Sequence, residues 1–223
     1  MLLCIEGIDG SGKGTITELL KEHFDRAGKK TQLFSFPAYC KNAWSELIGK
    51  YLDGQFGLFP IEVQAALFAL ERLHSREELK AALACNDIVF CDRYVPSNLA
   101  YAAAGVEKEK EQQIIKLILD LEYEQMGLPR PDGIVFMDMP LDLAISNVAK
   151  KQGRRYTKNV LDLLERQREL LHNVAGFYAQ MQQWHPDAKF LRVDCTTGEK
   201  QDDLRYFPDL VSEVVSFIQS FLE

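Results

Sequence analysis

The sequence predicts an α/β fold in which a mainly parallel sheet of about five strands carries helices on both faces. Two observations lead to this prediction. Five apolar runs of strand length recur along the chain, and most are apolar at consecutive positions, which is typical of strands covered on both faces. Segments with helical spacing of apolar residues lie between these runs, so that strand and helix alternate from end to end.

The predicted strands and helices follow one another from the first residues to the last. The strands are Leu2–Ile5, Thr31–Phe36, Asp87–Cys91, Gly133–Met137 and Lys189–Val193. The helices are Lys13–Ala27, Ile61–Ala84, Ser97–Ala104, Lys108–Gln125, Leu141–Lys150, Val160–Gln183 and Leu210–Phe221. Ligands of a parallel sheet bind at the edge where the strands end at their carboxyl side, so we expect the functional residues there.

Length and charge limit the class of protein. A chain of 223 residues buries a full core as one domain, residues 1–223, and is short for two independent domains. The net charge of −7 argues against a surface for nonspecific binding to nucleic acid or to anionic membranes. No apolar run is long enough to cross a bilayer, and Met1 to Ile5 lead into Glu6 and a glycine loop instead of a cleavage site. We therefore expect a cytoplasmic protein with small-molecule ligands.

The five cysteines are scattered, odd in number and without a C-x-x-C pair. Neither a disulfide framework nor a zinc site is indicated. Cys4, Cys91 and Cys195 lie in or at the ends of apolar runs, where we expect them to be small buried hydrophobic residues.

The first predicted strand leads into a loop with the phosphate-loop pattern G-x-x-x-x-G-K, followed by a predicted helix. The glycines let successive backbone N–H groups turn inward around a phosphate, and the helix start adds its positive end. Lys13 supplies a mobile cation for β- and γ-phosphates. The fold class is therefore the three-layer P-loop NTPase fold. The predicted ATP-binding residues are Gly7, Ile8, Asp9, Gly10, Ser11, Gly12, Lys13, Gly14 and Thr15.

One position departs from the general pattern. Gly14 stands where Ser or Thr usually binds Mg²⁺, and Thr15 follows, so direct hydroxyl ligation from position 14 is impossible. The Gly-Lys-Gly-Thr form resembles adenylate kinase loops, which implies that phosphates and water hold most of the Mg²⁺ shell. The chain has no N-K-x-D guanine motif, which argues against a GTPase switch.

Two carboxylates are candidate metal ligands, directly or through water. Asp9 lies inside an anion-binding loop, where it would repel phosphate unless it faces a Mg²⁺ shell or a sugar hydroxyl. It is also explained as a turn-forming residue with its side chain in solvent. Asp92 closes the third strand, where it either orders Mg²⁺-bound water or braces Arg93 by a salt bridge.

Beyond the loop, the sequence resembles the thymidylate kinase family over most of its length. Each matching segment is weak alone, but their order and spacing agree jointly with the family. The segments are the loop G-I-D-G-S-G-K, Phe36-Pro37-x-Tyr39, Phe68-x-x-x-Arg72, Asp92-Arg93-Tyr94, Ser97-Asn98-x-x-Tyr101, and Pro131-Asp132 through Asp138-Met139-Pro140.

The resemblance implies a binding site for dTMP. Phe68 would stack on the pyrimidine, and Arg72, one helical turn later, would reach a base carbonyl. Asn98 offers donor and acceptor groups to the base N3–H and its neighbouring carbonyl. Tyr101 would pack at C2′ of the deoxyribose and leave no room for a 2′-hydroxyl. Taken singly, residues such as Phe68 and Tyr101 on helices are more often core residues than ligand contacts, and Arg72 is more often a surface residue.

The remaining acceptor-side residues come from the same resemblance. Arg93 would grip the acceptor phosphate with its planar guanidinium, and Tyr39 and Asp9 correspond to residues near that phosphate and the 3′-hydroxyl. The resemblance also implies a homodimer. The predicted substrate-binding residues are Asp9, Pro37, Tyr39, Phe68, Arg72, Arg93, Ser97, Asn98 and Tyr101.

A basic segment from Lys150 to Lys158 packs five cations into nine positions of an acidic chain. It is either a solvated surface or a mobile lid over the ATP phosphates. The middle of the phosphate loop has no basic residue, so the resemblance implies that lid residue Arg154 or Arg155 supplies the charge. With Lys13 and Arg93, these are the candidate catalytic residues. The strand ending at residues 193–198 lies where related kinases have a loop beside adenine, and residues 200–208 have no explanation from sequence.

The function that follows from the resemblance is transfer of the ATP γ-phosphoryl group to dTMP, giving dTDP and ADP, with Mg²⁺. One alternative is a kinase for another acceptor, such as dUMP, another monophosphate or a deoxynucleoside. A second alternative is a regulatory protein that binds ATP without transferring phosphate. Gly14 keeps the second alternative open, and Phe68, Arg72, Asn98 and Tyr101 argue against it, because a pure ATP switch does not use them.

Overall fold

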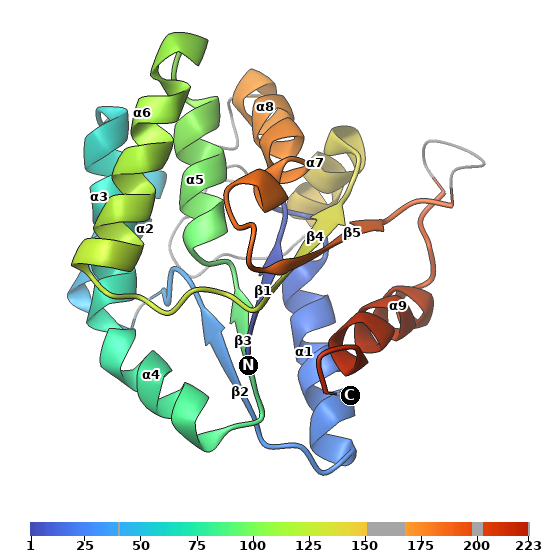
Figure 1. Ribbon diagram of the computed structural model, residues 1–223. Coiled ribbons are helices and arrows are strands. Elements are labelled where there is room, and N and C mark those ends of the chain that lie inside the picture. Colours follow the sequence, from blue (N-terminus) through green and yellow to red (C-terminus); the bar gives the residue numbers. More distant parts are fainter. Residues whose placement is uncertain (40, 151–167, 198–202, 223) are drawn as a thin grey trace.

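The computed structural model describes residues 1–39, 41–150, 168–197 and 203–222. Its centre is a sheet of five strands, all parallel, in the order β2-β3-β1-β4-β5 (Figure 1). The fold class is confirmed, and the predicted strand bounds differ from the observed ones by no more than one residue. The strands are β1 (Leu2–Glu6), β2 (Thr31–Ser35), β3 (Ile88–Asp92), β4 (Gly133–Asp138) and β5 (Lys189–Asp194).

Helices connect these strands and cover the sheet. Within the described residues, no helix is both long and apolar enough to cross a membrane. The α-helices are α1 (Lys13–Arg26), α2 (Ala43–Leu52), α3 (Ile61–His74), α4 (Arg76–Cys85), α5 (Val95–Ala104), α6 (Lys108–Leu119), α7 (Leu141–Lys150), α8 (Arg168–Tyr178) and α9 (Phe207–Gln219). Two short helical turns are a π-helix, η1 (Asp120–Gln125), and a 3₁₀-helix, η2 (Met181–Gln183).

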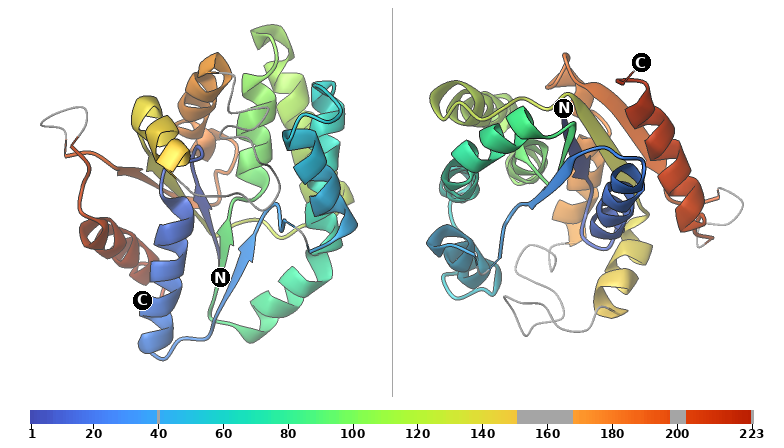
Figure 2. Two further views of the ribbon diagram at one scale, coloured as in Figure 1. Left: turned by 180° about the vertical axis from the view of Figure 1, so that it is seen from behind. Right: turned by 90° about the horizontal axis from the view of Figure 1, so that it is seen from below.

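The helices form a layer on each face of the sheet (Figure 2). On one face α1 packs against α9; α1 also contacts β1, β2 and β3, and α9 contacts β5. On the other face α5 packs against α8, with α3 and α6 beside α5. All five residues of β1 are buried, as are all but the last of β3 and of β4, whereas β2 and β5 at the edges are partly exposed. Burial on both faces explains why the central strands are continuously apolar.

Two of the predicted helices are interrupted in the structure. The prediction of one helix over residues 61–84 is wrong, because the backbone leaves the helical region at Ser75 and starts α4 in a new direction. Residues 108–125 begin as α6 and end as the π-helical turn η1.

Helix α2 is absent from the sequence prediction, although its start carries a recognisable signal. The Asn42 side chain accepts a hydrogen bond from the Ser45 N–H (2.8 Å), and Ser45 Oγ accepts one from the Asn42 N–H (3.2 Å). This reciprocal pair is a variant of the capping box in which Ser replaces the usual Glu or Gln, and it satisfies two backbone donors at the helix start.

Part of the sequence prediction lies outside the described residues. This holds for residues 151–158 of the predicted lid, with Arg154 and Arg155, for the first part of the predicted helix 160–183, and for residues 198–202. Helix α8 and η2 fall within the remainder of that predicted helix.

The strand register positions the functional edge of the sheet. Ile5 of β1 lies opposite Asp92 of β3, and Ser35 of β2 lies opposite Asp92 from the other side. The loops that follow β1, β2 and β3 therefore leave the sheet next to one another, and the predicted phosphate-loop and acceptor residues share one edge.

Candidate active site

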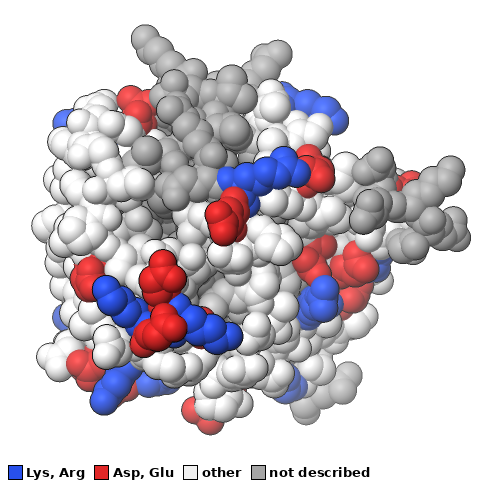
Figure 3. Space-filling view, turned by 90° about the horizontal axis from the view of Figure 1, so that it is seen from above, with Lys and Arg blue, Asp and Glu red and all other residues white. Residues whose placement is uncertain are grey.

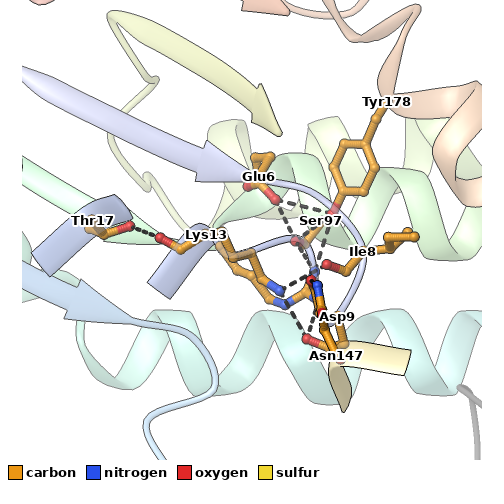
Figure 4. Close-up of polar contacts among 10 residues, drawn as sticks. Glu6, Ile8, Asp9, Lys13, Thr17, Ser97, Asn147 and Tyr178 are labelled. Atoms are coloured by element: carbon orange, nitrogen blue, oxygen red, sulfur yellow. Dashed lines mark hydrogen bonds and ion pairs between the residues drawn. The ribbon is translucent and has the colours of Figure 1, made fainter. Parts of the chain in front are cut away.

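The phosphate loop occupies residues 7–12 between β1 and α1. Gly7, Gly10 and Gly12 have φ angles of 147°, 85° and 87°, a region that favours glycine. Gly10 also lies against α7, where an added Cβ would be 2.0 Å from the Ala144 carbonyl oxygen. Asn147 Nδ2 of α7 donates to the Gly10 carbonyl oxygen (3.0 Å; Figure 4). The middle of the loop is thus fixed by α7.

Lys13 and Arg93 converge on one carboxylate oxygen of this loop. Lys13 Nζ donates to Asp9 Oδ1 (2.9 Å) and to the Ile8 carbonyl oxygen (3.3 Å; Figure 4), and Arg93 Nη2 donates to the same Asp9 Oδ1 (2.8 Å). Asp9 is therefore ion-paired, and its interpretation as a solvent-facing turn residue is wrong. Among the described residues, the carboxylate that pairs with Arg93 belongs to Asp9 and not to Asp92.

The two cations determine the protonation of this cluster. Burial alone would raise the pKa of the Asp9 carboxyl, but Arg93 and Lys13 hold that pKa well below its usual value. Burial and the charge of Arg93 lower the pKa of Lys13, while Asp9 opposes that shift. The cluster therefore keeps an ionised carboxylate between two cations at the edge of the sheet.

Asp92 has the properties of a ligand for hydrated Mg²⁺. Its Oδ2 lies 3.2 Å from the position that a Cβ on Gly14 would take, so the absent side chain at Gly14 leaves space beside this carboxylate. Asp92 Oδ1 and Ser11 Oγ are buried without a hydrogen-bond partner among the described residues. In those residues no three His, Cys, Asp or Glu side chains gather to hold a metal by themselves. The arrangement fits Mg²⁺, which keeps water and phosphate oxygens as ligands.

A buried glutamate behind the loop was not predicted as a site residue. Glu6 accepts hydrogen bonds from the Tyr94 N–H (2.8 Å), Ser97 Oγ (2.5 Å) and the Tyr178 hydroxyl (3.1 Å; Figure 4). Arg93 Nη1 donates to the same two hydroxyls, at 3.0 Å to Ser97 and 3.3 Å to Tyr178. Burial raises the pKa of Glu6 to about 7, against the opposing effects of Ser97 and Arg93. The Arg93 guanidinium is thus held by Asp9 through Nη2 and by the Ser97 and Tyr178 hydroxyls, which also bind Glu6, through Nη1.

The backbone at Arg93 is strained. Its φ of 67° lies in the left-handed region, and within the described residues it is the one non-glycine residue with positive φ. Such a conformation costs on the order of 1 kcal/mol and persists where surrounding contacts over-determine it. The Arg93 guanidinium also lies over the Tyr101 ring, with the guanidinium carbon 5.5 Å from the ring centroid.

A pocket of about 550 Å³, part of it open to solvent, begins at Arg93 and extends between α2, α3 and α5. It unites every residue that the sequence predicts to bind the acceptor. These residues are Asp9, Pro37, Tyr39, Phe68, Arg72, Arg93, Ser97, Asn98 and Tyr101. Phe36, Leu52 and Gln64 complete the lining and were not among the predicted site residues.

A second buried glutamate, Glu71, holds the loop that follows β2 and lines the pocket. Glu71 Oε1 accepts from the Ala38 N–H (2.9 Å), between Pro37 and Tyr39. Burial raises the pKa of Glu71, and the Ala38 hydrogen bond opposes this effect. Glu71 therefore joins α3 to the loop that carries two predicted substrate-binding residues.

Glu122 of η1, also absent from the sequence prediction, binds two residues of the pocket lining, Arg72 and Asn98. Its carboxylate accepts from Arg72 Nε (2.5 Å) and Nη2 (2.8 Å) and from Asn98 Nδ2 (2.8 Å). Arg72 and Asn98 are 2% and 5% exposed, so the interpretation of Arg72 as a surface residue is wrong.

The donor side also brings distant segments together. Thr15 is exposed on the first turn of α1. Thr196 forms an antiparallel bridge with Leu204, so the chain after β5 folds back before α9 begins. The Phe207 ring at the start of α9 lies 3.1 Å from the position of an added Cβ on Gly12. The start of α9 therefore lies beside the phosphate loop.

Figure 3 shows the molecule from the side of the carboxyl ends of the strands. Among the described residues on this face, Lys and Arg side chains lie beside Asp and Glu side chains. The cations of the site belong to local pairs such as Arg93 with Asp9. The cations of the site are thus balanced locally by carboxylates.

Known proteins resemble this chain in sequence and in fold. The family model described as thymidylate kinase matches residues 5–189. Thymidylate kinase of Mycobacterium tuberculosis is 31% identical over 183 residues, 81% of this chain and 85% of that protein. Thymidylate kinase of Coprothermobacter proteolyticus is 33% identical over 179 residues, 78% of this chain and 86% of that protein. A solved structure of thymidylate kinase from Candida albicans shares the fold, with a TM-score of 0.72, 19% identity, and coverage of 98% of this chain and 91% of that one. The chain therefore belongs to the thymidylate kinase family.

Proposed function

We propose that this enzyme transfers the γ-phosphoryl group of ATP to dTMP, giving dTDP and ADP. The observation that carries the proposal is the single pocket that joins the predicted acceptor residues to the phosphate loop. Asp9 belongs to both parts, because it lies in the loop and lines the pocket. A donor phosphate in the loop and an acceptor phosphate at Arg93 would then be neighbours.

The acceptor phosphate oxygen is already anionic, so the reaction needs no strong general base. The barrier comes from bringing two mutually repelling anions into line and from charge that shifts during transfer. Backbone N–H groups of the loop and Lys13 bind the ATP phosphates, and Arg93 binds the dTMP phosphate. Because Asp9 and the two hydroxyls fix the guanidinium beforehand, little reorganisation is needed during transfer.

We propose Asp92 and Asp9 as the residues that would hold Mg²⁺, directly or through water, with Asp92 as the main candidate. When bound, Mg²⁺ would neutralise charge on the β- and γ-phosphate oxygens. Asp92 would orient that ion or its water shell with Oδ1, the oxygen that has no partner among the described residues.

The acceptor end of the pocket is suited to a pyrimidine deoxynucleotide. Phe68 supplies an aromatic face for the base, and Arg72 and Asn98 supply polar groups at its edge. Tyr101, held beside Arg93, would occupy the space of a 2′-hydroxyl. These roles are proposals that follow from the family resemblance and from the shared pocket.

The direct test is ADP release by the purified protein with ATP and Mg²⁺, comparing dTMP, dUMP, UMP, AMP and thymidine as acceptors. A strong preference for dTMP supports the proposal. Activity on another acceptor alone would retain the kinase chemistry and overturn the pocket assignment. ATP binding without transfer to any acceptor would indicate a regulatory protein.

We also propose a homodimer formed through α3 and α6. These helices contact each other, and Val63 on α3 and Leu117 on α6 are large apolar residues that are 50% and 43% exposed. Helix α5 is almost entirely buried against its neighbours, so it offers little surface to a partner. Light scattering should give twice the chain mass, and Val63→Glu with Leu117→Glu should give the monomer mass.

Two further expectations from sequence remain proposals. The chain would fold as one domain, which a single cooperative unfolding transition would support. The enzyme would work in the cytoplasm, which fractionation of the source cells tests.

A further inference from the structure

Two side chains at the base end of the pocket share one buried carboxylate. Glu122 is 0% exposed and pairs with Arg72 in the parallel, two-bond geometry of a carboxylate and a guanidinium. The same carboxylate accepts from Asn98. Helices α3 and α5 carry Arg72 and Asn98, and η1 carries Glu122, so three segments meet at this point.

The surroundings allow the Asn98 amide only one orientation. Asn98 Nδ2 donates to Glu122 Oε1 (2.8 Å) and to the Ala65 carbonyl oxygen (3.0 Å). Both partners are acceptors, so the reversed amide would place its own oxygen against two oxygens. Both N–H groups of Asn98 are therefore used within the protein. The atom that it offers to a ligand is Oδ1, an acceptor, which corrects the expectation that this amide gives the base both a donor and an acceptor.

Arg72 offers the complementary group. A guanidinium has five N–H donors, and Glu122 takes one from Nε and one from Nη2. The remaining donors belong to a side chain that lines the pocket. Glu122 already balances the charge of Arg72 in a buried place, so Arg72 is suited to a neutral carbonyl oxygen. At the other end Arg93 and Lys13 share the carboxylate of Asp9, which leaves positive charge for a phosphate.

We infer that Glu122 is a positioning residue that sets base selectivity by fixing Asn98 as an acceptor and Arg72 as a donor. The pocket then takes a base edge with an N–H group beside a carbonyl. Thymine and uracil present this edge at N3–H and O4. Cytosine presents an acceptor at N3 and a donor at its 4-amino group, so both of its groups are mismatched. The inference deepens the proposed function and rests on it.

The test compares dTMP with dCMP in wild type and in Glu122→Gln. A glutamine at this position can donate to Asn98, which removes one of the two oxygens that oppose the reversed amide, while the Ala65 carbonyl oxygen remains. In wild type we expect kcat/KM for dTMP to exceed that for dCMP by roughly a thousandfold or more. In Glu122→Gln this ratio should fall by about tenfold or more, through a higher KM for dTMP, with KM for ATP unchanged. An unchanged ratio would overturn the inference.

Glu71→Gln is the matched control. Glu71 is a second buried carboxylate next to the pocket lining, 1% exposed, and it accepts a hydrogen bond from the Ala38 N–H. This variant should keep the dTMP-to-dCMP ratio, whatever its effect on turnover. If the ratio fell as much in Glu71→Gln as in Glu122→Gln, the loss of any buried carboxylate charge would reduce selectivity. This result would overturn the specific role of Glu122.

Wild-type protein gives a second measurement if Glu122→Gln does not fold. N3-methyl-dTMP lacks the N3–H group and should compete with dTMP at least about tenfold more weakly than dUMP does, and so should dCMP. Competition by dCMP or N3-methyl-dTMP as strong as that by dUMP would refute an acceptor-only Asn98. Failure of the wild type to phosphorylate any acceptor is a different result, because it refutes the proposed function.

Discussion

Arg93 Nη2 donates to Asp9 Oδ1 across 2.8 Å, and this contact joins the end of β3 to the phosphate loop that follows β1. It is the link between the two halves of the site, since Asp9 also binds Lys13. Each half was predictable by itself from its sequence motif. Their connection determines how an acceptor phosphate would be placed relative to ATP.

The first prediction is that Arg93→Ala keeps the fold and lowers turnover by roughly 100- to 1,000-fold, because a fixed cation is lost where charge shifts. Steady-state ADP release with dTMP measures this effect. Arg26→Ala is the matched control, since Arg26 is an exposed arginine at the end of α1 that is paired with Glu22. Turnover in Arg93→Ala equal to that of the control would remove Arg93 from the mechanism.

A second prediction concerns the contact between the loop and α7. Gly10→Ala should destabilise the protein by more than about 3 kcal/mol, because its Cβ would meet the Ala144 carbonyl oxygen at 2.0 Å. Gly28→Ala has a similar positive φ, 79° against 85°, with no atom near the added Cβ, and should cost only about 1–2 kcal/mol. Urea unfolding compares the two variants. Equal costs would show that α7 does not constrain the loop.

A third prediction follows from the pKa of Glu6, which burial raises from 4.5 to about 7. The folded protein then binds more protons than the unfolded chain between these pH values, so the contribution of Glu6 to the free energy of unfolding falls as pH rises. The change is about 3 kcal/mol. Subtracting the unfolding free energy of Glu6→Gln from that of wild type at each pH isolates it. A flat difference from pH 4.5 to 7 would contradict the account.

The contribution of His185 to the free energy of unfolding should show the opposite pH dependence. Burial lowers the pKa of His185 from 6.5 to about 4, and its Nε2 lies 2.8 Å from the Tyr123 hydroxyl. The unfolded chain binds more protons in this range, so the stability contributed by His185 is lost as pH falls through it, by about 3 kcal/mol. The difference between wild type and His185→Gln should therefore grow from pH 4 to 6.5. A difference that shrinks would mean that this imidazole is protonated in the folded state.

A feature of the structure can be predicted from the sequence when the residues that determine it are close together in the chain. The strands and the phosphate loop were predictable because a continuous apolar run and a fixed glycine spacing express their cause within a few residues. The acceptor residues were identified by the order of several motifs, and the structure places them around one pocket.

The residues that were missed act through contacts distant in sequence. Glu6 meets Tyr178 across 172 positions, and Glu122 meets Asn98 across 24. Asp120, Glu122 and Glu124 alternate within one helical segment, but only Glu122 is buried. Glu122 lies in the π-helical turn η1, and the helical spacing of the sequence did not predict a π-helix at these residues. Glu6 did carry a signal, as a charged residue at the end of a wholly apolar strand.

The central claim is that phosphate passes from ATP to dTMP in this pocket. The most direct measurement is the fate of label from γ-³²P-ATP incubated with the protein, Mg²⁺ and dTMP, with products separated by chromatography. The account predicts labelled dTDP in the same amount as the ADP formed, and a severe loss of both in Arg93→Ala. Label that remains in ATP, or appears only as inorganic phosphate while dTMP is unchanged, would contradict it.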